Sequence, residues 1–132
     1  MFQIKARVDY GLLIMFELAK NPRQVTPVTK IAKRMGVSSI YLIQIAKSLY
    51  QAGLVKSKEG AQGGYFLAKS PGQISILQII EALEGKIELS CATDKSHQCP
   101  HTKACQVRSV WGEILPDLKK VLKKRSLASL LK

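Results

Sequence analysis

The sequence predicts a mainly α-helical fold that contains one small β-hairpin. Apolar residues recur at helical spacing along most of the chain, and two short β-prone runs surround a glycine-rich turn. A long segment near the C-terminus carries a further apolar stripe at near-heptad spacing. Two short helices joined by a glycine-containing turn, with a hairpin soon after, indicate a winged helix-turn-helix followed by a long C-terminal dimerisation helix.

The first two helices have clear boundaries in the sequence. Residues 9–20 are apolar at helical spacing, and the pattern stops at an Asn-Pro pair. Thr26 is the expected N-cap of a second helix over 27–35, with Pro27 at its first position. Gly36 is expected to end this helix and to form the turn that leads to the next one.

A third helix is expected over 39–52, and a hairpin follows it directly. The β-prone runs are 54–58 and 65–68, and the glycine-rich turn between them is 59–64. A hairpin in this position is a wing. The turn does not resemble a nucleotide-binding loop, because it does not join a strand to a helix and lacks the Gly-Lys-Ser/Thr sequence.

The last third of the chain predicts a short helix over 76–83, an irregular segment over 86–104 and a long helix over 104–124. Ser75 is the expected cap of the short helix. Pro116 predicts a kink in the long helix, and Ser126 caps a final turn over 127–131. The long helix carries an apolar stripe of Val107, Val110, Trp111, Ile114, Leu118, Val121 and Leu122. One small appendage cannot bury such a stripe alone, so we expect a homodimer with this helix at the intersubunit seam.

The charge is concentrated at the two ends of the chain. Of the formal net charge of +12, residues 1–58 carry +8, residues 59–106 carry −1 and residues 107–132 carry +5. Basic ends around a neutral middle favour a surface that binds a polyanion such as double-stranded DNA. The chain has no run of about 18 apolar residues and no signal-peptide pattern, so we expect a cytoplasmic protein with no membrane association.

In a helix-turn-helix the second helix enters the major groove, and its first residues meet the base edges. The residues expected to lie at base edges are Ser38, Ser39, Tyr41 and Gln44. Those expected at phosphates are Lys47, Lys56 and Lys58, with Lys30, Lys33 and Arg34 as further candidates. Gln62 stands at the wing tip, within reach of a minor groove. The alternative role of Tyr41 is that of a core aromatic residue. The alternative for the lysines is a solvated face with no DNA contact.

Three cysteines lie within fifteen residues, with the spacing Cys91-x7-Cys99-x5-Cys105. Thiolates on a loop suit an iron–sulfur cluster or zinc, and both normally need a fourth ligand. The local candidates are His97 and His101, with Asp94 as a harder oxygen donor. The remaining alternative is that the three cysteines are unrelated buried or surface thiols. The sequence supplies no general base or nucleophile constellation beside the cysteines, so we expect neither an enzyme nor a small-molecule substrate.

Together these segments resemble the Rrf-type regulators, the group that includes IscR, NsrR and RirA. The resemblance covers essentially the whole chain. It is carried by residues 41–55, by the wing residues Gly60, Gly63, Gly64 and Tyr65, and by the three cysteines before a long helix. It implies a homodimer whose long helices cross, an iron–sulfur cluster near the dimer interface, and DNA binding controlled by the state of that cluster.

The resemblance also bears on the ligands. IscR-like proteins use a histidine three residues after the third cysteine, where this chain has Arg108. NsrR-like proteins hold a [4Fe–4S] cluster, and some use an acidic residue at the start of helix one of the partner subunit, which corresponds to Asp9. The resemblance thus favours a [4Fe–4S] cluster over a [2Fe–2S] cluster, held by Cys91, Cys99, Cys105 and Asp9, with His97 and His101 as rivals for the fourth place.

Two positions depart from the family pattern. Glu59 stands where the family commonly has an arginine that reaches the minor groove, and Ile43 stands where IscR has a base-reading glutamate. Phosphate repels an acid at the wing, so the wing of this chain is expected to read DNA differently. Lys58 is the nearest cation that could take the arginine's place.

The expected organisation has three parts. Residues 1–84 form the DNA-binding domain, 85–104 the cysteine loop, and 105–132 the dimerisation helix with its C-terminal turn. The expected function is sequence-specific repression of transcription, controlled by an iron–sulfur cluster that senses nitric oxide, iron or redox state. The alternative is a winged-helix regulator whose cysteines act as a thiol or zinc switch without a cluster.

Overall fold

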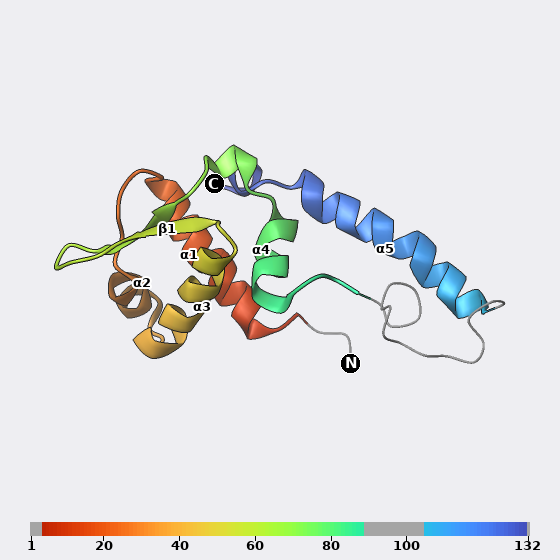
Figure 1. Cartoon of the computed structure of the whole chain (residues 1–132), viewed down its shortest axis with the longest axis horizontal. Helices are drawn as coiled ribbons and strands as arrows, with labels where there is room; N and C mark the ends of the chain where they lie inside the picture. Colours follow the sequence, from red (N-terminus) through yellow and green to blue (C-terminus); the bar gives the residue numbers. More distant parts are fainter. Residues whose placement is uncertain (1–3, 89–104, 132) are drawn as a thin grey trace.

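The computed structural model of the chain describes residues 4–88 and 105–131. Its elements are α1 Ala6–Lys20, α2 Val28–Met35, α3 Ser39–Gln51, β1 Val55–Lys58, β2 Gly64–Leu67, the short 3-10 helix η1 Pro71–Gln73, α4 Ile76–Glu84, α5 Gln106–Lys124 and α6 Leu127–Leu130. Figure 1 shows α1, α2 and α3 at one end of the molecule beside the protruding hairpin, with α5 extending to the other end. The predicted helical fold with one hairpin is confirmed.

Helix α1 begins at Ala6, earlier than the predicted start at residue 9. The reason is that Val8 is buried, so the buried apolar pattern already includes the residue before Asp9. Asp9 therefore lies within the first turn of the helix, where a carboxylate interacts favourably with the helix dipole. The C-terminal boundary at Lys20 agrees with the prediction.

The helix-turn-helix consists of α2 and α3. Gly36 between them has φ +68°, the left-handed conformation that glycine adopts readily, and the amide of Val37 donates to the carbonyl of Ala32 at 3.1 Å. The predicted Thr26 cap is wrong, because Pro27 is the N-cap residue and no side chain caps the helix. Thr26 is used elsewhere, in backbone pairing with the wing.

The wing is the antiparallel pair β1–β2, with Val55 opposite Leu67 and Lys58 opposite Gly64. The backbone of Thr26 adds a bridge on the other side of β2, through two N–O hydrogen bonds of 2.9 Å with Tyr65. At Gly64 this approach leaves no room for a side chain, since a Cβ there would lie 2.3 Å from the Thr26 carbonyl oxygen. The wing is thereby attached to the start of the helix-turn-helix.

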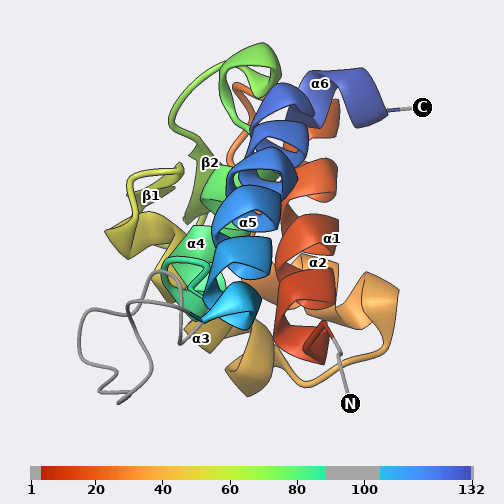
Figure 2. The same cartoon turned by 90° about the vertical axis from the view of Figure 1, so that its right-hand side faces the viewer.

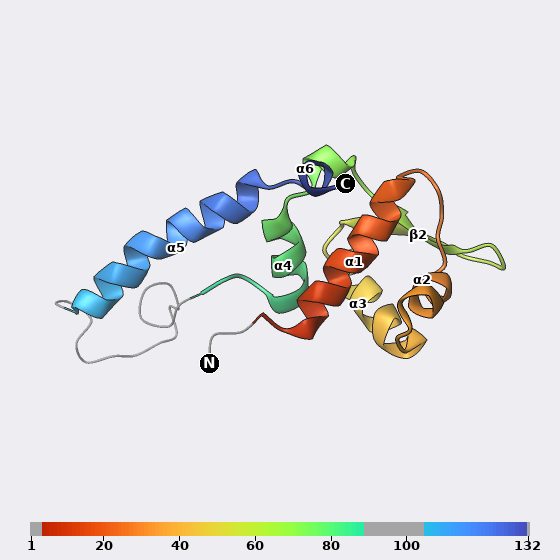
Figure 3. The same ribbon diagram turned by 180° about the vertical axis from the view of Figure 1, so that it is seen from behind.

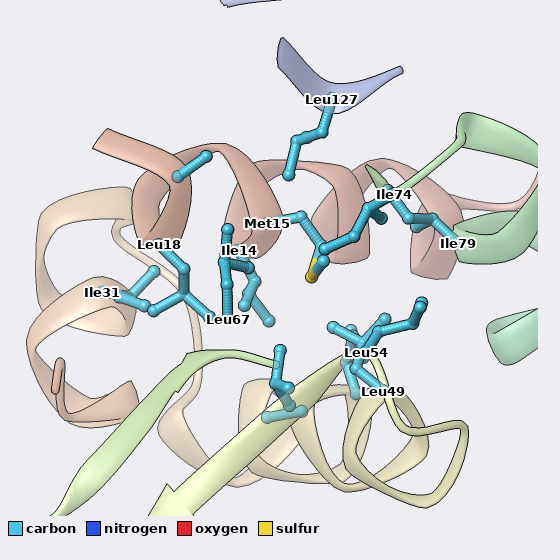
Figure 4. Close-up of a cluster of buried hydrophobic side chains, with 14 of the residues drawn as sticks. Ile14, Met15, Leu18, Ile31, Leu49, Leu54, Leu67, Ile74, Ile79 and Leu127 are labelled. Atoms are coloured by element: carbon cyan, nitrogen blue, oxygen red, sulfur yellow. The ribbon is translucent and has the colours of Figure 1, made fainter. Parts of the chain in front are cut away.

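The hydrophobic core lies between α1, α3, α4 and the base of the wing. Figure 4 shows its buried side chains, which include Ile14, Met15, Leu18, Ile31, Leu49, Leu54, Leu67, Ile74, Ile79 and Leu127. Leu127 comes from α6, so the end of the described chain returns to the core that the first four α-helices form. Two backbone hydrogen bonds hold it there, from Ile76 N to Arg125 O at 2.9 Å and from Leu127 N to Ile74 O at 2.8 Å.

Two helices in the second half of the molecule begin with the caps that their sequences predict. Ser75 and Gln78 form a capping box at α4, and Ser126 forms the equivalent box at α6 with Ser129. Between them α5 runs through Pro116 as one helix and contacts α4, beside which it lies in Figures 2 and 3. Among residues 4–88 and 105–131, no helix is long and apolar enough to cross a membrane.

Candidate nucleic-acid interface

The outward face of α3 is defined by helical spacing. Ile40, Gln44 and Lys47 are four and three residues apart, so their side chains share one face. The opposite face, made of Leu42, Ile45, Ala46 and Leu49, is buried in the core. Ile40, Gln44 and Lys47 are all exposed, and Figure 1 shows α3 at the same end of the molecule as the wing. We call Ile40, Ile43, Gln44 and Lys47 the outer face of α3.

Tyr41 lies to the side of this outer face and is half-buried. Its ring packs edge-on against Tyr10 of α1, with the ring centroids 5.6 Å apart and the planes at 89°. This is the arrangement of an aromatic residue at the rim of the core, which was its alternative role. Ser38 and Ser39 stand at the start of the helix, where the Ser38 side chain makes no cap hydrogen bond.

Sequence reasoning did not select Ile40, which is 72% exposed and is the most exposed large hydrophobic side chain that the structure describes. The signal was present in the sequence, because Ile40 lies one helical turn before Gln44. Ile43, on the flank of the same face, is 45% exposed.

The cations around the outer face differ in how free they are to bind phosphate. Lys47, Lys56 and Lys58 are exposed and form no ion pair with any described residue. Arg34 of α2, by contrast, pairs with Glu17 of α1. Lys56 and Lys58 lie on β1, so the first strand of the wing presents positive charge beside α3.

Glu17 joins α1 to α2. Its carboxylate accepts a hydrogen bond from Lys20 Nζ at 2.6 Å and another from the Arg34 guanidinium. The hydrogen bond from Lys20 and the charges of both cations hold the pKa of the Glu17 carboxyl below its ordinary value, although partial burial opposes this shift. Arg34 thus has a structural partner that its sequence position did not reveal.

The tip of the wing carries Glu59 and Gln62, and both residues are exposed. Glu59 directly follows Lys58 at the end of β1, so charges of opposite sign stand next to each other there. Gln62 has the exposure that contact with DNA requires. The only acidic group in the wing is therefore at its tip, directly after the last cation of β1.

Arg7 lies between the end of α4 and the recognition helix α3. Its Nη2 donates a hydrogen bond to Ser48 Oγ of α3 at 3.2 Å, while its Nε lies 4.0 Å from Oε1 of Glu84, the last residue of α4. That separation is too long for a hydrogen bond, and Nε is buried without a hydrogen-bond partner among the described residues. Lys5 Nζ also pairs with Glu84, at 3.6 Å.

Two of the predicted cluster ligands, Cys91 and Cys99, lie outside the described residues. The rival ligands His97 and His101 also lie outside them. Cys105 is described as the half-buried N-cap residue of α5, and its thiol forms no disulfide. Asp9 is exposed and forms no ion pair with a described residue. Residues 4–88 and 105–131 contain no group of three metal-binding side chains. The Cys105 thiol is the kind of donor that iron–sulfur clusters use, and the exposed Asp9 carboxylate is an oxygen donor without an ion-pair partner among the described residues.

Helix α5 exposes most of its apolar stripe. Val107, Val110, Trp111, Ile114, Leu118 and Val121 are each between 41% and 58% exposed. Leu115 is buried, and Leu122 is partly buried against the core. One side of α5 therefore packs on its own chain, while the apolar stripe faces outward.

A helix-turn-helix with a hairpin wing, and with exposed lysines on α3 and β1, defines a winged-helix DNA-binding protein. The chain matches the Rrf2 family, described as iron-dependent transcriptional regulators, over residues 4–132. It belongs to the Rrf2 family and is a DNA-binding transcription regulator. Members of this family are regulators and not enzymes, as the sequence predicted.

Individual relatives carry several names. CymR of Bacillus subtilis strain 168 is 36% identical over 97% of this chain and 88% of its own length. A solved structure of this global cysteine regulator has a TM-score of 0.75 and covers 98% of this chain and 96% of that one. NsrR of Halalkalibacterium halodurans is 28% identical over 98% of this chain and 90% of its own length. A structure of T. potens IscR is 33% identical, with a TM-score of 0.76 over 98% of this chain and 85% of that one.

Proposed function

We propose that this regulator is a homodimeric, sequence-specific repressor whose affinity for DNA depends on an iron–sulfur cluster, most simply a [4Fe–4S] cluster. The observation that carries the proposal is the position of Cys105. This third cysteine is the N-cap residue of α5, the helix that carries the exposed apolar stripe. The cysteine loop also begins where α4 ends. Glu84 at that end lies beside Arg7, which donates a hydrogen bond to Ser48 of α3.

The apolar stripe of α5 supports the homodimer. Six large apolar side chains exposed along one helix favour association, because burying apolar surface is worth roughly 25 cal/mol per Å². Pairing with the same helix of a second copy also sets two recognition helices at a fixed distance. This distance must match half-sites separated by about one turn of DNA or a multiple of it.

The proposed ligands are Cys91, Cys99, Cys105 and the partner subunit's Asp9. The exposed Asp9 carboxylate supports this set, because no described side chain of its own chain occupies it. His97 and His101 are the rivals for the fourth position. When bound, the cluster supplies a centre that is sensitive to nitric oxide, iron supply and oxidants.

Two contacts of Arg7 support a route from the cysteine loop to the DNA-binding face. Glu84 ends α4, Arg7 lies beside it, and the same guanidinium holds Ser48 of the recognition helix. A shift of the α4 end would change the position of Arg7 and thereby the tilt of α3. Small shifts of packed helices are a known way to change the spacing of two binding elements.

The test is anaerobic purification followed by an absorption spectrum with iron and sulfide analysis. We expect visible absorption with stoichiometric iron and sulfide, and its loss when Cys91, Cys99 or Cys105 is replaced by Ala. The affinity for a selected DNA duplex should differ between the loaded and the cluster-free protein by at least about fivefold, a typical allosteric coupling. Equal affinity of the two forms would refute control by the cluster while leaving DNA binding intact.

A thiol or zinc switch is the second candidate, and the three thiol donors themselves favour it. Similarity does not separate the two candidates, because the relatives include an NsrR, an IscR and a global cysteine regulator. Metal analysis does separate them. Zinc, or no metal with a thiol-dependent affinity, would replace the cluster proposal.

A further inference from the structure

Two isoleucines stand on the part of α3 that faces solvent in the isolated chain. Ile40 is 72% exposed and Ile43 is 45% exposed, and both lie within the first half of the helix. Gln44 is next to Ile43 in sequence and one helical turn after Ile40. Single exposed apolar residues are ordinary, but here two β-branched side chains lie together on the outer face, directly before its one amide.

Their surroundings are cationic. Lys47 follows on the same face of α3, and Lys56 and Lys58 lie on β1, which contacts α3; none of them pairs with a described acid. Exposed apolar side chains on a surface that also carries exposed cations suit a polyanion that offers a small apolar group. Duplex DNA meets this description, because the C5 methyl of thymine is the apolar feature of the major groove.

We propose that Ile40 and Ile43 select thymine by contact with its C5 methyl group, while Gln44 pairs with adenine. The inference rests on the proposed sequence-specific DNA binding and adds the bases that are read. A glutamine can form two hydrogen bonds with adenine N6 and N7, and an adjacent A·T pair places a methyl group in the same groove. The half-site is therefore centred on A·T pairs.

The experiment begins with a duplex selected from a randomised pool by the anaerobically purified full-length protein. Each thymine of its half-sites is then replaced singly by deoxyuridine, which differs only in lacking the methyl group. We expect at least one replacement per half-site to weaken binding roughly fourfold, the effect of removing one buried methyl group. The replacement of thymines outside the half-sites is the control on the DNA side.

The matched variants are Ile40→Ala, Ile43→Ala and Lys47→Ala. An isoleucine variant should bind thymine and deoxyuridine duplexes equally at the position that its side chain contacts. Lys47→Ala should bind both duplexes more weakly and keep the wild-type ratio between them, because a phosphate contact does not distinguish bases. Ile43→Val keeps a branched side chain and should keep most of the preference. Ile40 and Ile43 are exposed, so their truncation removes no core contact.

The experiment distinguishes failure of this inference from failure of the proposed sequence-specific binding. Equal binding of thymine and deoxyuridine duplexes by the wild-type protein at every position would overturn this inference and leave sequence-specific binding in place. A deoxyuridine effect that persists unchanged in both isoleucine variants would also overturn it. If no duplex is enriched from the pool, sequence-specific binding itself fails, and the inference fails with it.

Discussion

Gly64 shows how a single residue positions the wing. A Cβ at this residue would lie 2.3 Å from the carbonyl oxygen of Thr26 and 2.4 Å from its carbon. Both atoms belong to the backbone and cannot turn aside as a flexible side chain would. A glycine is therefore required where β2 pairs with the segment before α2.

We expect Gly64→Ala to lower the free energy of unfolding by about 1–3 kcal/mol, the usual cost of overpacking. The measurement is urea denaturation followed by circular dichroism. Gly72→Ala is the matched control, because nothing lies within 4 Å of a Cβ at Gly72. An equal loss in both variants would mean that the close approach to Thr26 is not the cause.

Glu17 leads to a prediction about pH. Its folded pKa is lowered, first by the hydrogen bond from Lys20, so its ion pairs stabilise the fold above the ordinary glutamate pKa and lose this effect as the pH falls. We expect Glu17→Gln to be less stable than the wild type at pH 7 by about 0.5–1 kcal/mol. The difference should shrink below about pH 4 as the carboxylate of the wild type is protonated. Denaturation curves of both proteins at pH 7 and below about pH 4 check this. A stability difference between them that stays constant with pH would contradict it.

At the scale of elements, α4 and α3 are connected through α1. Arg7 contacts Ser48 of α3 and lies beside Glu84 of α4, and its buried Nε has no hydrogen-bond partner among the described residues. The guanidinium is therefore held by a hydrogen bond on the α3 side only, because its Nε is too far from Glu84 to form one.

We expect Arg7→Ala to reduce the difference in DNA affinity between the loaded and the cluster-free protein by roughly threefold or more, within the range of mutations that alter coupling. Titration of both forms with a selected duplex measures this ratio. Lys5→Ala is the control, because Lys5 also pairs with Glu84 but has no hydrogen bond to α3. If Lys5→Ala has the same effect, the contact with Ser48 is not what transmits the change.

The recognition helix and the wing predict a dependence on salt. Lys47 of α3 and Lys56 of β1 are exposed without ion pairs among the described residues. We expect Lys56→Ala to weaken binding to all duplexes similarly and to reduce the slope of log affinity against log salt by about 1. Glu59→Gln serves as the comparison: removal of an acid at the wing tip should strengthen binding instead.

The whole molecule has an exposed apolar stripe that one chain does not cover. Ile114 is in the middle of this stripe on α5 and is 46% exposed. We expect Ile114→Glu to convert the dimer to a monomer, because dimerisation would bury the introduced charge in an apolar interface. Light scattering after size exclusion measures the mass. Lys120→Glu, an exposed position of the same helix outside the stripe, should remain dimeric, and a monomeric wild type would contradict the proposed assembly.

Much of the fold could be predicted because its signals are local. The capping serines Ser75 and Ser126, the left-handed Gly36 and the apolar spacing of α3 all act within a few residues of themselves. Errors arose where a distant segment competed for a local group. Thr26 is the clearest case, since its backbone pairs with Tyr65 and its side chain caps no helix.

The sequence alone determined the winged helix-turn-helix, the long helix behind it and the spacing of the three cysteines. Tertiary structure decided how individual residues are used. It turned Tyr41 toward Tyr10, left Ile40 exposed at the start of the recognition helix, and paired Arg34 with Glu17. The physical reason is distance along the chain. Helical periodicity and caps depend on neighbours, whereas a contact such as Arg7 with Ser48 joins residues 41 positions apart and exists only once the helices have packed.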